Sequence, residues 1–264
     1  MKLNVVLRTC DRASLQTDRI VPKNECIWRC LNSLSRSLEQ SNLDFQLHII
    51  DDNSTAETVE QIQRIAPAGT TFDLLPARDQ EHLNPKQRSR FSVDRAYQYV
   101  YSLPQDELVY IVEDDYLHYP DSISRIVQAY EYFSYFDADI NIGIFPQDFN
   151  QLYPHPGNPY NSVYVRECVV IPGPDRYYRT TWFTHESFMV STKLITQYRE
   201  DFEKLLNIGT IEGAWEGSSL SKVWTRPDVK MLMPLGTHVI HLGNRRDISF
   251  FVQDWQQLWE RNRV

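Results

Sequence analysis

Three consecutive carboxylates, Glu113, Asp114 and Asp115, follow an apolar run at residues 108–112. Such a run is typical of a buried strand, so the carboxylates are predicted to lie where the strand meets solvent. Ionised carboxylates held close together repel, and their pKa values rise unless a divalent metal or a basic partner compensates them. Carboxylate oxygens suit Mg²⁺ or Mn²⁺, and substrate phosphates usually complete the coordination shell. The motif therefore indicates a metal site for a nucleotide-diphosphate substrate.

The same cluster is also compatible with a solvated turn that leads into a helix cap, because structural ion networks perturb carboxylates as well. Residues 116–121 lead into an amphipathic run at residues 122–133, so the carboxylates are expected at a strand-to-helix crossing. In open α/β sheets, ligands bind outside the carboxyl ends of the strands. This position favours the functional interpretation.

The composition is that of an ordinary globular protein. At 264 residues, of which 42% are hydrophobic and 23% charged, the chain can bury a large core and fits a single domain. Its formal net charge of −8 disfavours a nucleic-acid surface, because such surfaces are usually basic. No stretch approaches the roughly 20 apolar residues that cross a bilayer, and residues 1–8 are too short for a secretory signal. We therefore expect a cytoplasmic protein, with peripheral membrane contact left open.

The four cysteines, Cys10, Cys26, Cys30 and Cys168, show neither a zinc spacing nor a disulfide-rich pattern. Cys26 and Cys30 lie four residues apart on a predicted helix, so we expect reduced thiols that pack on one face. No chemistry is assigned to them.

The first half of the chain alternates between strand-like and helix-like segments, which favours parallel β-α-β units over a meander. Ser54 is the expected N-cap of the second helix, and Glu57 three residues later would complete a capping box. The pattern predicts the front half of a nucleotide-binding α/β fold. Strands are predicted at residues 3–7, 46–50, 72–75 and 108–112, and helices at residues 24–38, 54–65, 88–101 and 122–133.

The pattern changes after a strand predicted at residues 141–145. Residues 146–159 are rich in Pro, Asn, Tyr and Gly, which is typical of an irregular loop over a site or boundary. No internal repeat or low-complexity tract divides the chain. Strands are predicted at residues 163–171, 177–183 and 187–190, helices at residues 193–206, 215–224 and 248–261, and short apolar stretches at residues 231–235 and 237–242.

Taken in order, the motifs resemble those of glycosyltransferases of the GT-A fold, over most of the chain. This resemblance implies a Rossmann-like, mixed and mainly parallel sheet flanked by helices. It also implies a nucleotide-sugar-binding half at residues 1–145 and an acceptor-binding half, which completes the metal site, at residues 146–264. The motifs that carry the resemblance are Arg8-Thr9-Cys10-Asp11-Arg12, Ile50-Asp51-Asp52-Asn53-Ser54, residues 84–95, Val112-Glu113-Asp114-Asp115, Trp215-Glu216-Gly217 and Thr237-His238-Val239-Ile240-His241-Leu242-Gly243.

The resemblance implies a transferase that binds Mn²⁺ or Mg²⁺ and a nucleotide-sugar donor, with a UDP-sugar as the first choice. In similar enzymes the last carboxylate of the acidic motif, here Asp115, coordinates the metal, while Asp114 and Glu113 face the ribose and either the donor sugar or waters around the metal. The motif departs from the commoner Asp-x-Asp form by having Glu113 at its first position. The acceptor is expected to be a glycan, a lipid-linked molecule or a protein.

A late histidine is the second candidate metal ligand. His241, followed by Leu242 and Gly243, resembles a His-hydrophobic-Gly element that supplies a second protein ligand in some of these enzymes. Neutral imidazole binds Mn²⁺ beside carboxylate and phosphate oxygens. His238, three residues earlier, is the competing candidate, and the choice between the two histidines stays open.

The predicted donor contacts begin at the ends of the first two strands. Arg8, Thr9 and Asp11 line the first of these ends. Asp52, at the second, can accept hydrogen bonds from a uracil or ribose edge. Asp52 and Asn53 are equally compatible with a turn and a helix cap.

Basic side chains supply the remaining donor contacts. A guanidinium can bind a diphosphate in bidentate fashion, which favours Arg90 at a helix start, although a basic run is often a solvated helix face. Arg245 is the candidate for neutralising the diphosphate leaving group.

An inverting transfer needs a carboxylate near the acceptor hydroxyl to take its proton. Glu216 is the first candidate for this base and Glu212 the second, and Trp215 is a site candidate because it adjoins Glu216. Glu216 is also compatible with a simple role at a helix N-terminus, an effect of roughly 0.3 to 1 kcal/mol.

Two other functions share this layout. A sugar nucleotidyltransferase generally has a Gly-rich phosphate loop after the first strand, whereas residues 8–19 contain no glycine. A non-catalytic carbohydrate- or protein-binding module is the other alternative. The sequence leaves open the donor sugar, the acceptor, inversion or retention, and the oligomeric state.

Overall fold

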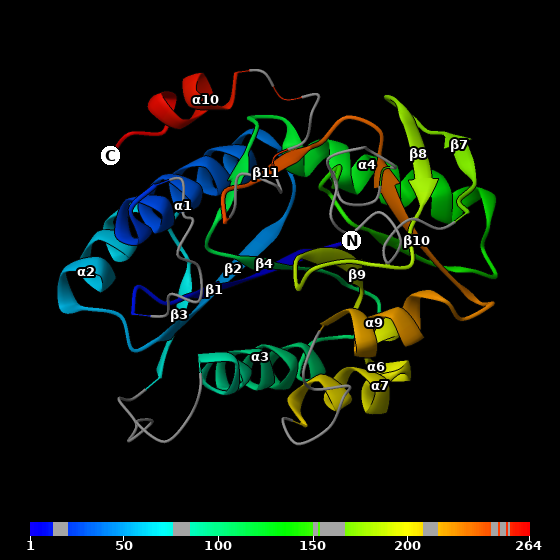
Figure 1. Ribbon diagram of the computed structural model, residues 1–264, viewed down its shortest axis with the longest axis horizontal. Coiled ribbons are helices and arrows are strands. Elements are labelled where there is room, and N and C mark those ends of the chain that lie inside the picture. The colour runs from blue at the N-terminus through cyan, green and yellow to red at the C-terminus, as the bar shows by residue number, and fades with distance from the viewer. Residues whose placement is uncertain are drawn as a thin grey trace.

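A mixed β-sheet runs through the middle of the molecule, with helices on both of its faces (Figure 1). This computed structural model describes residues 1–12, 21–75, 85–149, 153, 167–207, 216–243, 248, 252 and 254–264, and for residues 85–88 and 216–218 it describes the backbone alone. In that part of the chain, nine strands form the main sheet in the order β3-β2-β1-β4-β9-β6-β10-β8-β7. Two further strands, β5 and β11, form a small separate sheet.

The strands are short, and the main sheet changes from parallel to antiparallel pairing where β9 enters it. β1 pairs in parallel with β2 and β4, and β2 with β3, whereas β9 runs antiparallel to both β4 and β6. β10 is parallel to β6, and β8 is antiparallel to β10 and β7. The strands are β1 (Leu3–Thr9), β2 (Phe45–Asp52), β3 (Thr71–Leu75), β4 (Leu108–Glu113), β5 (Tyr116–His118), β6 (Asn141–Ile144), β7 (Val170–Pro172), β8 (Tyr177–Thr180), β9 (Phe188–Ser191), β10 (Val229–Pro234) and β11 (Val239–His241).

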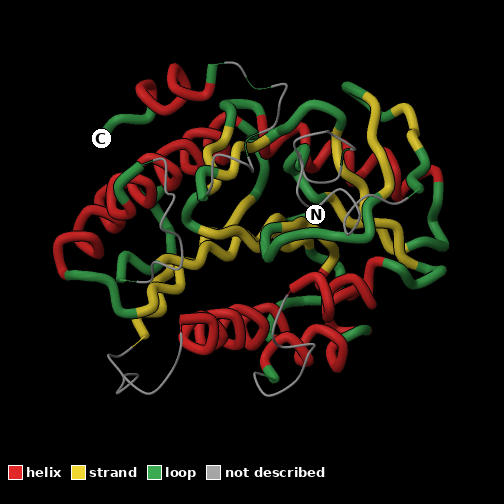
Figure 2. The backbone as a smooth tube through the Cα atoms, in the orientation of Figure 1, coloured by secondary structure: helices red, strands yellow, loops and turns green. Residues whose placement is uncertain are grey.

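The helices cover the sheet in two layers, as Figure 2 shows. Val5 and Leu7 of β1 belong to a core shared with α1, α2 and α4, whereas Val6 belongs to a core shared with α3, α6, α7 and α9. Central strands are apolar on both faces for this reason. The helices are α1 (Lys23–Gln40), α2 (Ala56–Ile65), α3 (Pro85–Tyr101), α4 (Ser122–Phe136), α6 (Thr192–Gln197), α7 (Arg199–Glu203), the 3₁₀ helix η2 (Lys204–Leu206), α9 (Glu216–Trp224) and α10 (Trp255–Arg261).

A third, smaller core lies under the β5–β11 sheet. Cys26, Cys30, Leu117, Ile240 and Trp259 are among its buried members. Both side chains are buried and their sulfur atoms lie 4.0 Å apart, so they pack on one helix face as predicted. Through this core, α1 and the C-terminal helix α10 hold the small sheet from one side.

The mixed sheet flanked by helices confirms the predicted fold class. The predicted strands and helices of the first half are all present, with ends that differ by a few residues. The strand β5 was not predicted, because only three residues separate the acidic cluster from Tyr119. No helix in the described parts of the chain is long and apolar enough to cross a membrane.

Several local predictions were wrong. The N-cap of α2 is Thr55, whose hydroxyl accepts from the Thr58 N–H, while Ser54 instead accepts from the Asp11 N–H. Residues 192–206 form three short helical segments, because the backbone leaves helical geometry at Tyr198. The last helix begins at Trp255, and part of the predicted segment 248–261 lies outside the described residues, as do residues 163–166 of a predicted strand.

Candidate metal and donor site

The small β5–β11 sheet brings Asp115 and His241 together. β5 begins directly after Asp115, and its antiparallel register pairs Tyr116 with His241. The Leu242 N–H donates to the Asp115 carbonyl oxygen at 2.8 Å, which locks this end of the ladder. The His241 Nε2 atom lies 3.3 Å from Asp115 Oδ1, and both side chains are buried. The geometry therefore joins two residues that the sequence separates by more than a hundred positions.

This pair has the ligand atoms of a site for Mn²⁺ or another transition-metal ion. A carboxylate oxygen and an imidazole nitrogen are both accepted ligands of such ions. The His241 ring stacks on Tyr116 at 4.8 Å between ring centroids, which fixes its plane. Among the residues that the structure describes, no group of three or more His, Cys, Asp or Glu side chains could hold a metal ion. The carboxylate oxygen of Asp115 and the imidazole nitrogen of His241 match the ligand preferences of such an ion.

Glu113 and Asp114 are each matched by a protein cation. The Arg8 guanidinium lies 3.1 Å from Glu113, and Lys23 forms an ion pair with Asp114, which also accepts from the Cys10 N–H at 2.9 Å. Burial raises the pKa of Glu113 to about 8 against the opposing Arg8 charge, and it raises the pKa of Asp114 against Lys23. Both predicted donor-contacting carboxylates therefore have partners within the protein.

Arg8 and Arg90 join a network of basic and acidic side chains that we call the edge cluster, formed by Arg8, Arg90, Glu186 and the partly exposed Glu113. Glu186 accepts from Arg8 Nη2 at 2.5 Å and from Arg90 Nη1. Arg8 is 7% exposed, Arg90 4% and Glu186 6%. Burial alone would raise the pKa of Glu186, yet the two guanidiniums hold it below its usual value. Both arginines predicted to bind donor therefore carry an internal counter-charge.

Sequence reasoning missed Glu186. The predicted donor residues follow strands, whereas Glu186 precedes β9. Since β9 runs antiparallel to β4, its first end lies at the carboxyl end of β4, and Ser187 there accepts from the Glu113 N–H. In the sequence, Glu186 can be recognised as a charged residue two positions before an apolar strand.

Thr9, Asp11 and Asp52 lie where the first two strands end. The Thr9 hydroxyl donates to Asp51 at 2.7 Å, and Asp11 accepts from the Thr55 N–H and hydroxyl at 3.0 and 2.6 Å. Asp52 is buried at the end of β2, and its carbonyl oxygen accepts from the Cys10 thiol. Thr9 and Asp11 thus shape the loops of this edge.

A model of the family described as Glycosyl transferase family 2 matches residues 22–206, which is more than half of the chain. The chain belongs to glycosyl transferase family 2. This family has the GT-A fold, in agreement with the fold predicted from the motifs. The matched span includes the acidic run and Glu186, and it ends before Glu216 and His241. The family assignment therefore covers one partner of the Asp115–His241 pair.

Three solved structures illustrate the similarity of this family 2 member to known proteins, each at low sequence identity. A galactosyltransferase in complex with donor and acceptor sugar analogues is 9% identical, with 86% of this chain and 72% of that chain covered and a TM-score of 0.45. A mannosyltransferase from Pyrobaculum calidifontis, in complex with GDP-Man and Mn²⁺, is 13% identical, with 92% and 57% covered and a TM-score of 0.49. A 4-diphosphocytidyl-2C-methyl-D-erythritol synthase from Anaerococcus prevotii is 12% identical, with 98% and 94% covered and a TM-score of 0.45. No curated protein matches the chain.

The remaining predicted site residues of this family 2 member fall into two groups. His238 lies in a different cluster from Asp115, where its Nε2 atom is 2.8 Å from the Tyr178 hydroxyl. Glu212, Trp215 and Arg245 lie outside the described residues, and Glu216 begins α9 but its side chain is not described.

His185 is a further residue beside the candidate site that sequence reasoning missed. Its ring lies 5.3 Å from the His241 ring, between centroids, and 4.7 Å from Phe149 in an edge-on arrangement. Thr184, the residue before it, accepts from the Trp224 indole N–H at 2.9 Å, and Glu186 follows it. The segment before β9 therefore forms one wall of the candidate site.

Proposed function

We propose that this chain is a metal-dependent glycosyltransferase that moves a sugar from a nucleotide-diphosphate-sugar, with a UDP-sugar as the first choice, to an acceptor hydroxyl with inversion. The observation that carries the proposal is the Asp115–His241 pair at the carboxyl end of β4. In this proposal, residues 1–145 bind the donor, and residues 146–264 bind a glycan, lipid-linked or protein acceptor and complete the metal site through His241.

The position of the pair supports Asp115 as the metal ligand within the acidic run. Glu113 and Asp114 contact Arg8 and Lys23, whereas Asp115 lies beside His241, whose imidazole is itself an accepted metal ligand. A bound Mn²⁺ or Mg²⁺ would offset the charge that develops on the departing diphosphate. Asp115 and His241 would hold that ion, and Arg245 would lie near the leaving group.

Proton removal from the acceptor is assigned to a carboxylate at the start of α9. Glu216 is the proposed base and Glu212 the second candidate, because an inverting displacement needs one carboxylate within reach of the attacking hydroxyl. The backbone of α9 packs beside α7 in the second core, which would give Glu216 a rigid support.

The central test of the proposal is the variant Asp115→Asn. We expect Mn²⁺-dependent turnover of a UDP-sugar to fall by at least about 10³-fold, because metal stabilisation of the leaving group is worth several kcal/mol. Asp137→Asn is the matched control, since Asp137 pairs with Lys230 in a partly exposed ion pair. Turnover by Asp115→Asn at the control rate would contradict the metal assignment.

The base is tested separately with Glu216→Gln. This variant should bind Mn²⁺ and UDP as the original protein does while sugar transfer falls by about 10²- to 10⁴-fold. An unchanged rate of sugar transfer would exclude Glu216 as the base and leave Glu212 as the candidate.

A further inference from the structure

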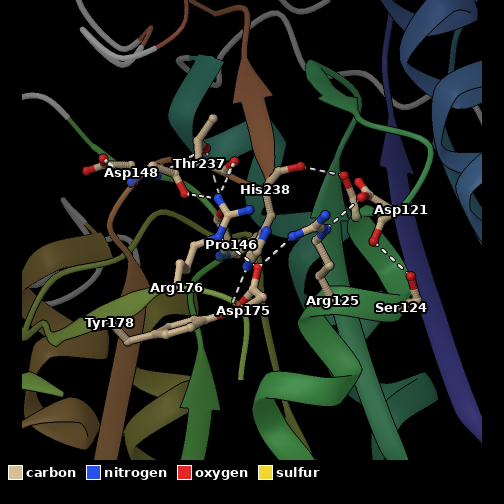
Figure 3. Close-up of polar contacts among 12 residues, drawn as sticks. Asp121, Ser124, Arg125, Pro146, Asp148, Asp175, Arg176, Tyr178, Thr237 and His238 are labelled. Carbon is tan, nitrogen blue, oxygen red and sulfur yellow. Dashed lines mark hydrogen bonds and ion pairs between the residues drawn. The ribbon is translucent and has the colours of Figure 1, made fainter. Parts of the chain in front are cut away.

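His238 directly precedes β11, and its side chain belongs to a polar cluster that we call the β11 anchor, formed by Arg125, Asp175, Arg176, Tyr178 and His238. Figure 3 shows Asp175 between Arg176 and Arg125, with Tyr178 and His238 beside it. The Tyr178 hydroxyl lies 2.9 Å from Asp175 Oδ1 and 2.8 Å from His238 Nε2. Tyr178 and His238 are 0% and 2% exposed, so these bonds are shielded from solvent.

The hydrogen-bond directions in the β11 anchor follow from proton counting. Asp175 also accepts from Arg125 Nη1 at 2.9 Å and from Arg176 Nε at 2.8 Å, so its oxygens act as acceptors. The Tyr178 hydroxyl has one proton and donates it to Asp175. It must then accept from His238, which therefore has its proton on Nε2. His238 is thus held by a directional chain that ends on a carboxylate.

The backbone on both sides of His238 is held by neighbouring elements. The His238 N–H donates to the Pro146 carbonyl at 3.0 Å, and its own carbonyl accepts from the Ser122 hydroxyl at the start of α4. In the two residues before His238, the Gly236 N–H donates to Asp148 at 2.8 Å, and Arg176 donates to the Thr237 carbonyl at 3.2 Å. Figure 3 shows Pro146, Asp148 and Arg176 near Thr237 and His238.

β11 links this anchored point to the candidate metal ligand. The strand rises about 3.3 Å per residue, so His238 and His241 are roughly 10 Å apart along one short strand. At the far end, His241 faces Tyr116 and Asp115 in the β5–β11 ladder. Metal–ligand distances are held within about 0.2 Å, so even a small shift of β11 moves His241 out of range.

We propose that His238 is a positioning residue for the metal site, which acts through the Tyr178–Asp175 bond to set the place of β11 and thereby of His241. This inference rests on the proposed function, because it takes Asp115 and His241 as the metal ligands. It gives His238 a role other than that of a competing ligand: His238 fixes the strand, and His241 binds the ion.

The test is a titration with Mn²⁺ alone, followed by the electron paramagnetic resonance signal of the free ion, at a temperature well below unfolding. Tyr178→Phe removes the hydroxyl that joins His238 to Asp175 and keeps the ring that packs edge-on against Phe133. We expect its Kd for Mn²⁺ to rise roughly 3- to 10-fold, below the 10- to 100-fold typical of a partner that touches the ligand itself. Tyr198→Phe is the matched control, since it removes a phenol bond to Asp228 at a remote place and should leave the Kd unchanged.

Two substitutions of His238 separate positioning from ligation. His238→Gln keeps an N–H donor where Nε2 lies and should bind Mn²⁺ within about 2-fold of the original protein, whereas His238→Leu should weaken binding as Tyr178→Phe does. If His238 were itself a ligand, both His238→Gln and His238→Leu would raise the Kd for Mn²⁺, and Tyr178→Phe would leave it unchanged.

The outcomes also separate this inference from the proposed function. A purely structural role would lower the free energy of unfolding of Tyr178→Phe and leave the Kd of its folded state unchanged, which would overturn the inference. Mn²⁺ binding that Asp115→Asn leaves unchanged would overturn the metal site itself, and the inference with it.

Discussion

The edge cluster and the β11 anchor are both buried polar clusters that lead to the Asp115–His241 pair, yet they are built from different groups. The edge cluster ends on Glu113, two residues before Asp115, and at its centre the Glu186 carboxylate lies between the guanidiniums of Arg8 and Arg90. The β11 anchor ends on His238, three residues before His241, and its buried end is a phenol and an imidazole. Breaking the first leaves buried ions without counter-charges, whereas breaking the second leaves single hydrogen-bonding groups unsatisfied.

The largest effect is therefore expected from the edge cluster. Glu186→Ala leaves the buried charges of Arg8 and Arg90 without their shared carboxylate, and the free energy of unfolding should fall by about 3–5 kcal/mol in urea titrations. Glu203→Ala, which breaks the exposed pair with Arg199, is the control and should leave the free energy of unfolding nearly unchanged. A loss for Glu186→Ala as small as that of the control would show that the edge cluster is not an ion chain of this kind.

The β11 anchor predicts a loss of stability that begins in mild acid, at the ordinary pKa of a histidine, because of His238. Burial, together with the Arg176 charge, lowers the pKa of His238 to about 3, below the ordinary histidine value of about 6.5. Between these pH values the unfolded chain binds a proton that the folded chain does not, so stability falls as the pH decreases through this window. The expected slope is about 1.4 kcal/mol per pH unit.

This prediction is measured as the difference between urea-unfolding curves of the original protein and His238→Gln at several pH values. Below pH ~6.5, the difference between their free energies of unfolding should shrink by about 1.4 kcal/mol per pH unit, the slope expected for one proton. His118, whose pKa is also lowered to about 3 by burial, remains in both proteins and cancels in the comparison. A difference in the free energy of unfolding that stays constant between pH ~6.5 and the lowered pKa of His238 would contradict a neutral, buried His238.

The smallest effect is expected at the exposed rim of the β11 anchor. Arg125 is 37% exposed and pairs with Asp121 and Asp175, so Arg125→Gln should lower the free energy of unfolding by about 0.2–1 kcal/mol. The loss should shrink further in high salt, because exposed pairs are screened. A loss comparable to that of Glu186→Ala would mean that exposure does not separate the two clusters.

The sequence was sufficient for the fold class and for the order of its first elements. Central strands such as β1 and β4 are apolar on both faces, and their runs can be recognised without knowledge of their neighbours. The acidic run could be found for a related reason, because it interrupts such a strand at its end. The packing of Cys26 and Cys30 on one face of α1 could be predicted from their four-residue spacing.

The partners inside the site could not be predicted in the same way. His238 and His241 differ by three positions and both lie in apolar surroundings, so their separate roles depend on the β5–β11 register, and β5 is too short to leave a clear pattern. Glu186 reaches Arg8 only because β9 enters the sheet in the antiparallel direction. Strand direction and register are long-range properties, and a local pattern does not contain them.

The central claim is that His241, and not His238, is the imidazole beside Asp115 at the metal. Pulsed electron paramagnetic resonance of Mn²⁺ bound with UDP detects directly coordinated imidazole nitrogen. We predict a nitrogen coupling in the original protein that persists in His238→Gln and disappears in His241→Gln. A coupling that persists in His241→Gln and disappears in His238→Gln would contradict the account.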